Sequence, residues 1–111
     1  MVKESVLLRT ILLAAPSLGA RLMRNNVGTL RDIRGNYVKY GLAIGSSDLV
    51  GWTVIDGRAI FTAVECKLPG KRPTAQQQQF LDAVTAAGGI AAVAYSVKDV
   101  RQAIEAYRGR R

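Results

Sequence analysis

Apolar residues recur at helical spacing in three parts of the chain. Residues 3–15 carry the first apolar stripe, and Pro16 then predicts the end of that helix. A second helix is predicted for residues 74–87, ahead of two consecutive glycines. A third is predicted to begin at Ser96, where Asp99 stands at capping-box spacing.

A β-hairpin is predicted in the middle of the chain. The β-rich runs 49–55 and 58–67 are separated by Asp56 and Gly57, a dipeptide that favours a two-residue turn with positive φ. In the second run both alternating sets of side chains are apolar, which is typical of a strand covered on both faces. We therefore expect residues 58–67 to form a central strand of a sheet.

Two shorter strands complete the predicted fold. They occupy residues 21–26 and 90–95, so the order becomes α-β-β-β-α-β-α. This order predicts an α/β fold with a mixed central sheet flanked by helices. A chain of 111 residues is long enough for one such core. Residues 1–111 are therefore interpreted as a single domain, with a frayed basic tail at 108–111.

The chain is strongly basic. Its 16 Lys and Arg against 8 Asp and Glu give a net charge of +8, which favours a polyanionic partner through steering and counterion release. Residues 21–39 contribute five basic side chains and one acid around Tyr37, a composition that suits a surface tracking phosphates. A solvated basic loop is the alternative interpretation of that segment.

Composition also restricts the chemistry and the setting. Histidine is absent, which excludes histidine-dependent hydrolase triads and histidine metal sites. Cys66 is the single cysteine, so an internal disulfide is excluded and a reducing compartment is favoured. The apolar N-terminal stretch contains Glu4 and Arg9, which disfavours a secretion signal, and it is too short to span a membrane. We therefore expect a cytoplasmic protein without a membrane segment.

Three charged residues stand out against the apolar hairpin. Glu65 and Lys67 lie two apart on the predicted central strand, so their side chains leave the same face. Burying both charges is costly and points to a third charged group between them. Asp48 heads the preceding strand, and the hairpin brings it beside Glu65. Two carboxylates, with the main-chain carbonyl of Cys66, are hard oxygen ligands that suit Mg²⁺ or Mn²⁺ bound to a substrate phosphate.

These residues match a known signature. Asp48, a spacer and Glu65-Cys66-Lys67 resemble the D...ExK motif of PD-(D/E)xK nucleases, which have a restriction-endonuclease-like core. Over residues 4–100 the chain is similar to the virus-type replication-repair nuclease (VRR-NUC) domain, although Cys66 and Gln76 depart from its usual residues. The further motifs that carry this similarity are Arg24-Asn25-Asn26-Val27-Gly28, Gly41-Leu42, Gly45-Ser46-Ser47, Gln77, Phe80-Leu81 and Ala87-Gly88-Gly89.

The resemblance implies a Mg²⁺-dependent endonuclease that hydrolyses phosphodiester bonds. Asp48 and Glu65 would hold the metal, with Mn²⁺ as a substitute, and Lys67 would orient or activate the attacking water. Glu4 would complete the metal site or orient water; a plain first-turn acid is the structural alternative. Gln77 would contact substrate or water. The implied substrate is structured DNA such as a Holliday junction, cut by a homodimer in a bacterium or a phage-infected cell, as for stand-alone members.

Nucleic-acid contacts are expected from polar and basic residues around these motifs. Tyr37, Lys39 and Tyr40 are equally compatible with sheet packing. The expected contacts are Arg24, Asn25, Asn26, Arg31, Arg34, Lys39, Ser46, Ser47, Lys71 and Arg72.

Structural interpretations of the motif residues stay open. Glu65 and Lys67 can form an ion pair on an edge strand, and Asp48 can cap a turn after two serines. Gln77 stands three residues after Thr74, which is capping-box spacing. Two other functions also remain: a non-catalytic module that binds branched DNA, and an RNA endonuclease.

Overall fold

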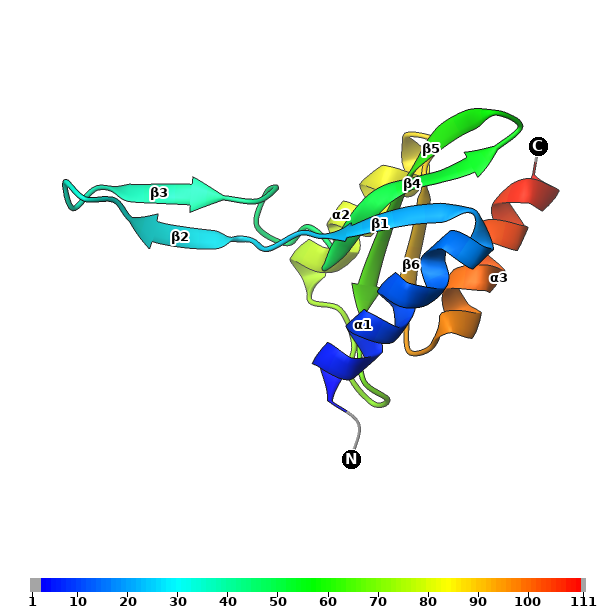
Figure 1. Cartoon of the computed structure of the whole chain (residues 1–111), viewed down its shortest axis with the longest axis horizontal. Helices are drawn as coiled ribbons and strands as arrows, with labels where there is room; N and C mark the ends of the chain where they lie inside the picture. Colours follow the sequence, from blue (N-terminus) through cyan, green and yellow to red (C-terminus); the bar gives the residue numbers. More distant parts are fainter. Residues whose placement is uncertain (1–2, 111) are drawn as a thin grey trace.

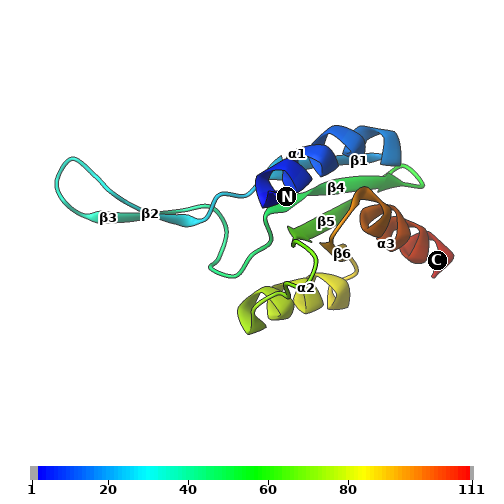
Figure 2. The same cartoon turned by 90° about the horizontal axis from the view of Figure 1, so that it is seen from below.

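This computed structural model describes residues 3–110. They form a four-stranded mixed sheet with helices on both faces and a separate two-stranded arm (Figures 1 and 2). The expected α/β class is confirmed. The elements are α1 (Glu4–Ala14), η1 (Ala15–Leu18), β1 (Ala20–Arg24), β2 (Gly28–Arg31), β3 (Tyr37–Tyr40), β4 (Leu49–Ile55), β5 (Arg58–Cys66), α2 (Ala75–Ala86), β6 (Ile90–Ala94) and α3 (Val97–Gly109).

The main sheet has the strand order β1-β4-β5-β6. The β1–β4 and β4–β5 pairs are antiparallel, whereas β5 and β6 are parallel and α2 forms the crossover between them. The predicted central strand is confirmed, because β5 is paired on both sides and is buried from Thr62 to Cys66. Asp56 and Gly57 have φ values of 53° and 73°, as the predicted hairpin turn requires.

The helices cover the two faces of the sheet unequally. Helices α1 and α3 lie on one face and α2 lies on the other (Figure 2). The larger core, between the sheet and α1 and α3, includes Ile11, Leu49 and Ile104. The smaller core, beneath α2, is built on Ala63 and Leu81. One face is therefore sealed by two helices, and the other has a single helix over it.

The predicted starts of α2 and α3 are confirmed by their caps. Thr74 Oγ1 accepts a hydrogen bond from Gln77 N–H at 3.2 Å, and Gln77 Oε1 accepts one from Thr74 N–H at 2.8 Å. At α3, Asp99 Oδ2 accepts from Ser96 N–H at 3.2 Å. These bonds satisfy backbone donors that a helix start leaves without partners.

The C-terminal end of the described chain is helical. Helix α3 continues through Arg108 and Gly109, and a frayed tail stays a prediction. Arg111 lies outside the described residues. None of the helices formed by residues 3–110 is long and apolar enough to cross a lipid bilayer.

The arm departs from the sequence prediction. The basic stretch within residues 21–39 is interpreted from the sequence as a surface tracking phosphates or a solvated loop, but β2 and β3 pair as an antiparallel ribbon that joins no other strand of residues 3–110. It projects from the body between the end of β1 and the start of β4 (Figure 1). The predicted order of elements therefore describes the body, with two further strands inserted.

Candidate active site

The register of β4 and β5 places Asp48 beside Glu65. Leu49 pairs with Val64, so Asp48 and Glu65 follow as the next positions along the two chains. Asp48 N–H donates to Glu65 Oε1 at 3.1 Å, and Asp48 Oδ2 accepts from Cys66 N–H at 2.9 Å. Two carboxylates therefore converge where β4 begins and β5 ends.

Lys67 completes the cluster. Its Nζ atom lies 3.4 Å from Glu65 Oε2, and its side chain is 15% exposed. Glu65 itself is only 1% exposed. The ion pair considered from the sequence is therefore present, but β5 has a neighbouring strand on each side, so its placement on an edge strand is wrong.

The electrostatics of Glu65 favour a cation between the carboxylates. Burial, followed by the nearby Asp48 charge, raises the pKa of Glu65 from 4.5 to about 7. The Lys67 ammonium acts in the opposite direction but offsets this only in part. A buried carboxylate facing a second carboxylate is costly when ionised, and a bound cation removes that cost.

The oxygen donors present fit a hard divalent cation. The Cys66 N–H points to Asp48, and a strand residue directs its N–H and C=O to the same neighbour, so the Cys66 carbonyl also faces this side. Among residues 3–110, no group of three or more His, Cys, Asp or Glu side chains is placed to hold a metal. Two carboxylates and one carbonyl make an open site, and Mg²⁺ typically keeps several waters in such a site.

Glu4 lies at the exposed start of α1, although Leu7 and Ile11 on the same helix are buried. Its charge still reaches the site: burial, then Asp48, Glu65 and Glu4, raise the pKa of Cys66 to about 12. The Cys66 thiol is therefore protonated at neutral pH in the metal-free protein.

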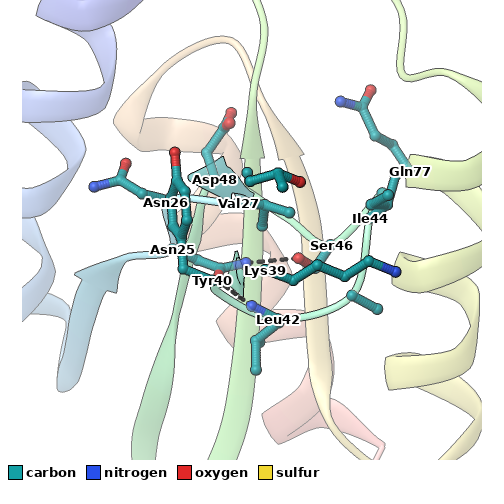
Figure 3. Close-up of a pocket in the computed structure, with 14 residues that line it drawn as sticks. Asn25, Asn26, Val27, Lys39, Tyr40, Leu42, Ile44, Ser46, Asp48 and Gln77 are labelled. Atoms are coloured by element: carbon teal, nitrogen blue, oxygen red, sulfur yellow. Dashed lines mark hydrogen bonds between the residues drawn. The ribbon is translucent and has the colours of Figure 1, made fainter. Parts of the chain in front are cut away.

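Asn25 ties the loop before β4 to Asp48. Its Nδ2 donates to Ser46 Oγ at 2.7 Å and its Oδ1 accepts from Leu42 N–H at 3.1 Å (Figure 3). The same Nδ2 donates to Ser47 O at 2.9 Å. Its own N–H donates to Asp48 O at 2.8 Å. The sequence singled out Asn25 as a nucleic-acid contact, whereas in the structure its amide is engaged within the protein.

A cavity of about 850 Å³ opens beside Asp48 (Figure 3). It is lined by the base of the arm, including Asn26 and Lys39, by the loop before β4, and by Gln77 of α2. Gln77 thus faces the cavity and also caps α2, so both roles considered for it are compatible with its position.

The remaining expected nucleic-acid contacts separate by exposure. Ser46 and Ser47 are buried, and the Ser47 hydroxyl donates to Leu49 O at 2.8 Å. The loop after β5 is held by Tyr95, whose Oη donates to Lys71 O at 2.8 Å, a contact that no sequence pattern indicated. The basic candidates are all exposed: Arg24, Arg31, Arg34, Lys39, Lys71 and Arg72.

The chain matches the model of a known protein family. The family model of the VRR-NUC domain matches residues 14–98, which is most of the chain. The matched region contains Asp48, Glu65 and Lys67 and begins after Glu4. No curated protein matches the chain.

Proposed function

The chain belongs to the VRR-NUC domain family, a family of nucleases, and from this premise we propose that it is a Mg²⁺-dependent endonuclease hydrolysing the phosphodiester bonds of DNA. The observation that carries the proposal is the cluster at the end of β5. There the buried Glu65 carboxylate lies against Asp48 N–H at 3.1 Å and Lys67 Nζ at 3.4 Å.

Asp48, Glu65 and the Cys66 carbonyl would hold the ion, and Mn²⁺ would substitute for Mg²⁺ because both prefer oxygen ligands. When bound, such an ion lowers the pKa of a coordinated water and neutralises charge on the phosphoryl oxygens. The raised pKa of Glu65 supports this assignment, since the fold places two carboxylates together without a full counter-charge. Glu4 would act through its charge at the edge of the cluster.

Lys67 would position the attacking water. An ammonium has three donors, and the contact with Glu65 Oε2 fixes the direction of the side chain while leaving donors for other partners. Its partial exposure places it between the buried strand and the solvent. From there it can hold water or a phosphate oxygen against the carboxylates.

DNA with branches, including Holliday junctions, is the proposed substrate. The cavity beside Asp48 has Lys39 and the exposed amide residue Asn26 in its lining, and Gln77 stands across from them (Figure 3). The net charge of +8 favours a polyanion. A backbone passing through this cavity would reach the carboxylates from the arm side.

A homodimer is also part of the proposal, because paired cuts in a junction require two sites related by symmetry. Support comes from the sheet face that carries α2. Trp52 pairs with Phe61 across β4 and β5, and Val54 lies on the same face. These three side chains are 40%, 44% and 50% exposed, respectively. A contiguous apolar patch of this kind typically marks a protein interface.

A cleavage assay tests the proposal. Four-way, flap and linear DNA, and RNA of matched sequence, are incubated with Mg²⁺ or EDTA and the wild type, Asp48→Asn, Lys67→Met or Lys98→Met protein. Asp48→Asn retains an acceptor for Cys66 N–H, so folding is preserved while a charge is lost. Lys98→Met is the matched control, because Lys98 is exposed on α3.

We expect cleavage of DNA only with Mg²⁺, and a loss on the order of 10²-fold to 10⁴-fold for Lys67→Met, the usual contribution of a positioned acid–base group. Asp48→Asn should bind DNA and fail to cut it. Binding without cleavage under every condition would favour the non-catalytic module instead. Cleavage confined to RNA would favour the RNA endonuclease.

A further inference from the structure

The β2–β3 arm stands away from the body. Every residue in the range 29–44 is exposed, and the radius of gyration is 14.7 Å. A compact chain of this length would have a radius of about 13 Å. An isolated two-stranded ribbon is marginally stable in water. The arm therefore adds little to the stability of the body. This favours a role for the arm in binding another molecule.

The turn of the arm presents one bare aliphatic side chain, Ile33, which is 102% exposed. Asp32 orders the turn, because its Oδ1 accepts from Arg34 N–H at 2.9 Å and from Asn36 N–H at 2.8 Å. Gly35 supplies the positive φ of 82° that the turn needs. A turn built with these hydrogen bonds holds Ile33 in the solvent at the end of the arm.

Positive charge surrounds this apolar tip. Residues 25–44 contain Arg31, Arg34 and Lys39 against a single acid, Asp32, whose carboxylate already serves the turn. The Arg31 guanidinium lies 5.3 Å from the centre of the Tyr37 ring, a cation–π contact that orients it. Arg31 pairs with Tyr37 across the ribbon, and Lys39 is two residues further along β3, so these three share one face. That face is complementary to a polyanion.

The arm is firmly joined to the candidate active site. Asn25 connects the first strand of the arm to Asp48 through the hydrogen bonds described above. A Cβ atom at Gly28 would collide with the Tyr40 ring, and one at Gly41 would collide with the Asn26 carbonyl. Such close packing at the base fixes the direction in which the arm leaves the body.

We propose that the arm inserts Ile33 into DNA where base stacking is already interrupted, while Arg31, Arg34 and Lys39 hold the flanking phosphates. Aliphatic side chains inserted between base steps act as wedges, and basic and amide side chains beside them suit the minor groove. Unstacking costs least where pairing is already broken. The inference rests on the proposed function, and it gives the same site a preference for branched or nicked DNA over continuous duplex.

The test measures binding rather than cleavage. Asp48→Asn protein in EDTA is titrated with a fluorescent four-way junction, a nicked duplex and a continuous duplex of the same sequence. Ile33→Ser is compared with Leu13→Ser, a control in which another exposed aliphatic side chain, 77% exposed on α1, is changed. A 2-aminopurine base beside the discontinuity reports unstacking.

Ile33→Ser should weaken binding to the junction and to the nicked duplex by about tenfold, the scale of one aliphatic side chain that is no longer buried, and leave binding to the continuous duplex unchanged. The 2-aminopurine signal should rise with the parent and with Leu13→Ser, and stay low with Ile33→Ser. Arg31→Gln and Lys39→Gln should each reduce the slope of log K against log salt by about one.

A second variant replaces residues 29–39 with Asn-Gly, a two-residue turn that joins Gly28 to its cross-strand partner Tyr40. This protein should bind the three DNAs with similar, weakened affinity. Equal binding by Ile33→Ser and its parent would overturn the inference. So would an equal loss on all three DNAs accompanied by conversion of a dimer to a monomer, because the tip would then contact a second copy. Absence of cleavage by the wild type would refute the proposed function and leave this binding result intact.

Discussion

Glu65 should make the metal-free protein less stable as the pH rises. Its pKa is 4.5 in the unfolded chain and about 7 in the fold, so folding favours the protonated carboxyl. The associated stability is complete below pH 4.5 and is lost as the pH rises through 7. Because Glu65 is buried, the loss amounts to about 3 kcal/mol. Glu65→Gln cannot ionise and should keep this stability.

Urea unfolding in EDTA checks this expectation. From pH 4 to pH 8 the unfolding free energy of Glu65→Gln should gain about 3 kcal/mol relative to the wild type. Glu105→Gln, at an exposed position on α3, should follow the wild-type profile. Mg²⁺ at pH 8 should stabilise the wild type alone and reduce the difference in unfolding free energy between Glu65→Gln and the wild type. Parallel pH profiles for Glu65→Gln and the wild type would contradict a raised pKa of Glu65 in the folded protein.

Asn25→Ala should loosen the loop that carries Asp48. The substitution removes two donated bonds, to Ser46 Oγ and Ser47 O, and one acceptor for Leu42 N–H. We expect the unfolding free energy to fall by about 1–3 kcal/mol, the cost of leaving the oxygens of the buried Ser46 and Ser47 unpaired. Thermal unfolding measures this, with Asn36→Ala in the exposed arm turn as the control. An equal melting temperature for Asn25→Ala and the wild type would exclude the structural role.

The three main site residues were within reach of sequence reasoning because hairpin geometry is local. The turn at Asp56 sets the register, and the register alone brings Asp48 to Glu65. The structural role of Asn25 could not be predicted from the sequence, because its hydrogen-bond partners depend on how residues 41–47 fold back. An amide side chain in a turn is equally typical of a surface contact.

At the scale of elements, the same hairpin offers a matched pair of glycine substitutions. A Cβ atom at Gly51 of β4 would collide with the Arg21 carbonyl of β1, whereas one at Gly57 would meet no atom within 4 Å. Gly51→Ala should therefore separate two paired strands and lower the unfolding free energy by about 3 kcal/mol, the upper range for overpacking. Gly57→Ala should cost about 1 kcal/mol for its left-handed φ. Urea midpoints give both values, and an equal loss for the two variants would contradict the close approach of β1 and β4.

The arm was missed at this scale for a physical reason. Its two strands have four residues each, and the alternation of Leu30 and Val38 against Arg31 and Lys39 is too short to distinguish from a polar loop. Because no core covers either face of the ribbon, its sequence does not need the alternation of apolar and polar residues that marks a half-buried strand. Helices α2 and α3 were predictable because capping residues mark their starts in the chain itself.

At the scale of the molecule, the arm and the carboxylate cluster share one end of the fold, since both adjoin the start of β4 (Figure 1). DNA held by the arm would lie along the cavity that leads to Asp48. The apolar patch on β4 and β5 then has to be covered without blocking that path, and a second copy packed on the patch would do so.

The patch predicts a dimer that one charge should dissociate. Trp52 is 40% exposed beside Phe61, and a stable interface needs about 800 Å² from each partner with an apolar centre. Trp52→Glu would bury an unpaired charge in that centre. Light scattering should give the wild type a mass twice the 12.0 kDa of the chain and Trp52→Glu a mass of 12.0 kDa, with circular dichroism confirming its fold. Leu13→Glu, on an exposed position of α1, should remain dimeric. A dimeric Trp52→Glu would place the symmetry contact elsewhere on the surface. A wild type that is monomeric at micromolar concentration would remove that contact, and paired cutting of a junction would then require two independent binding events.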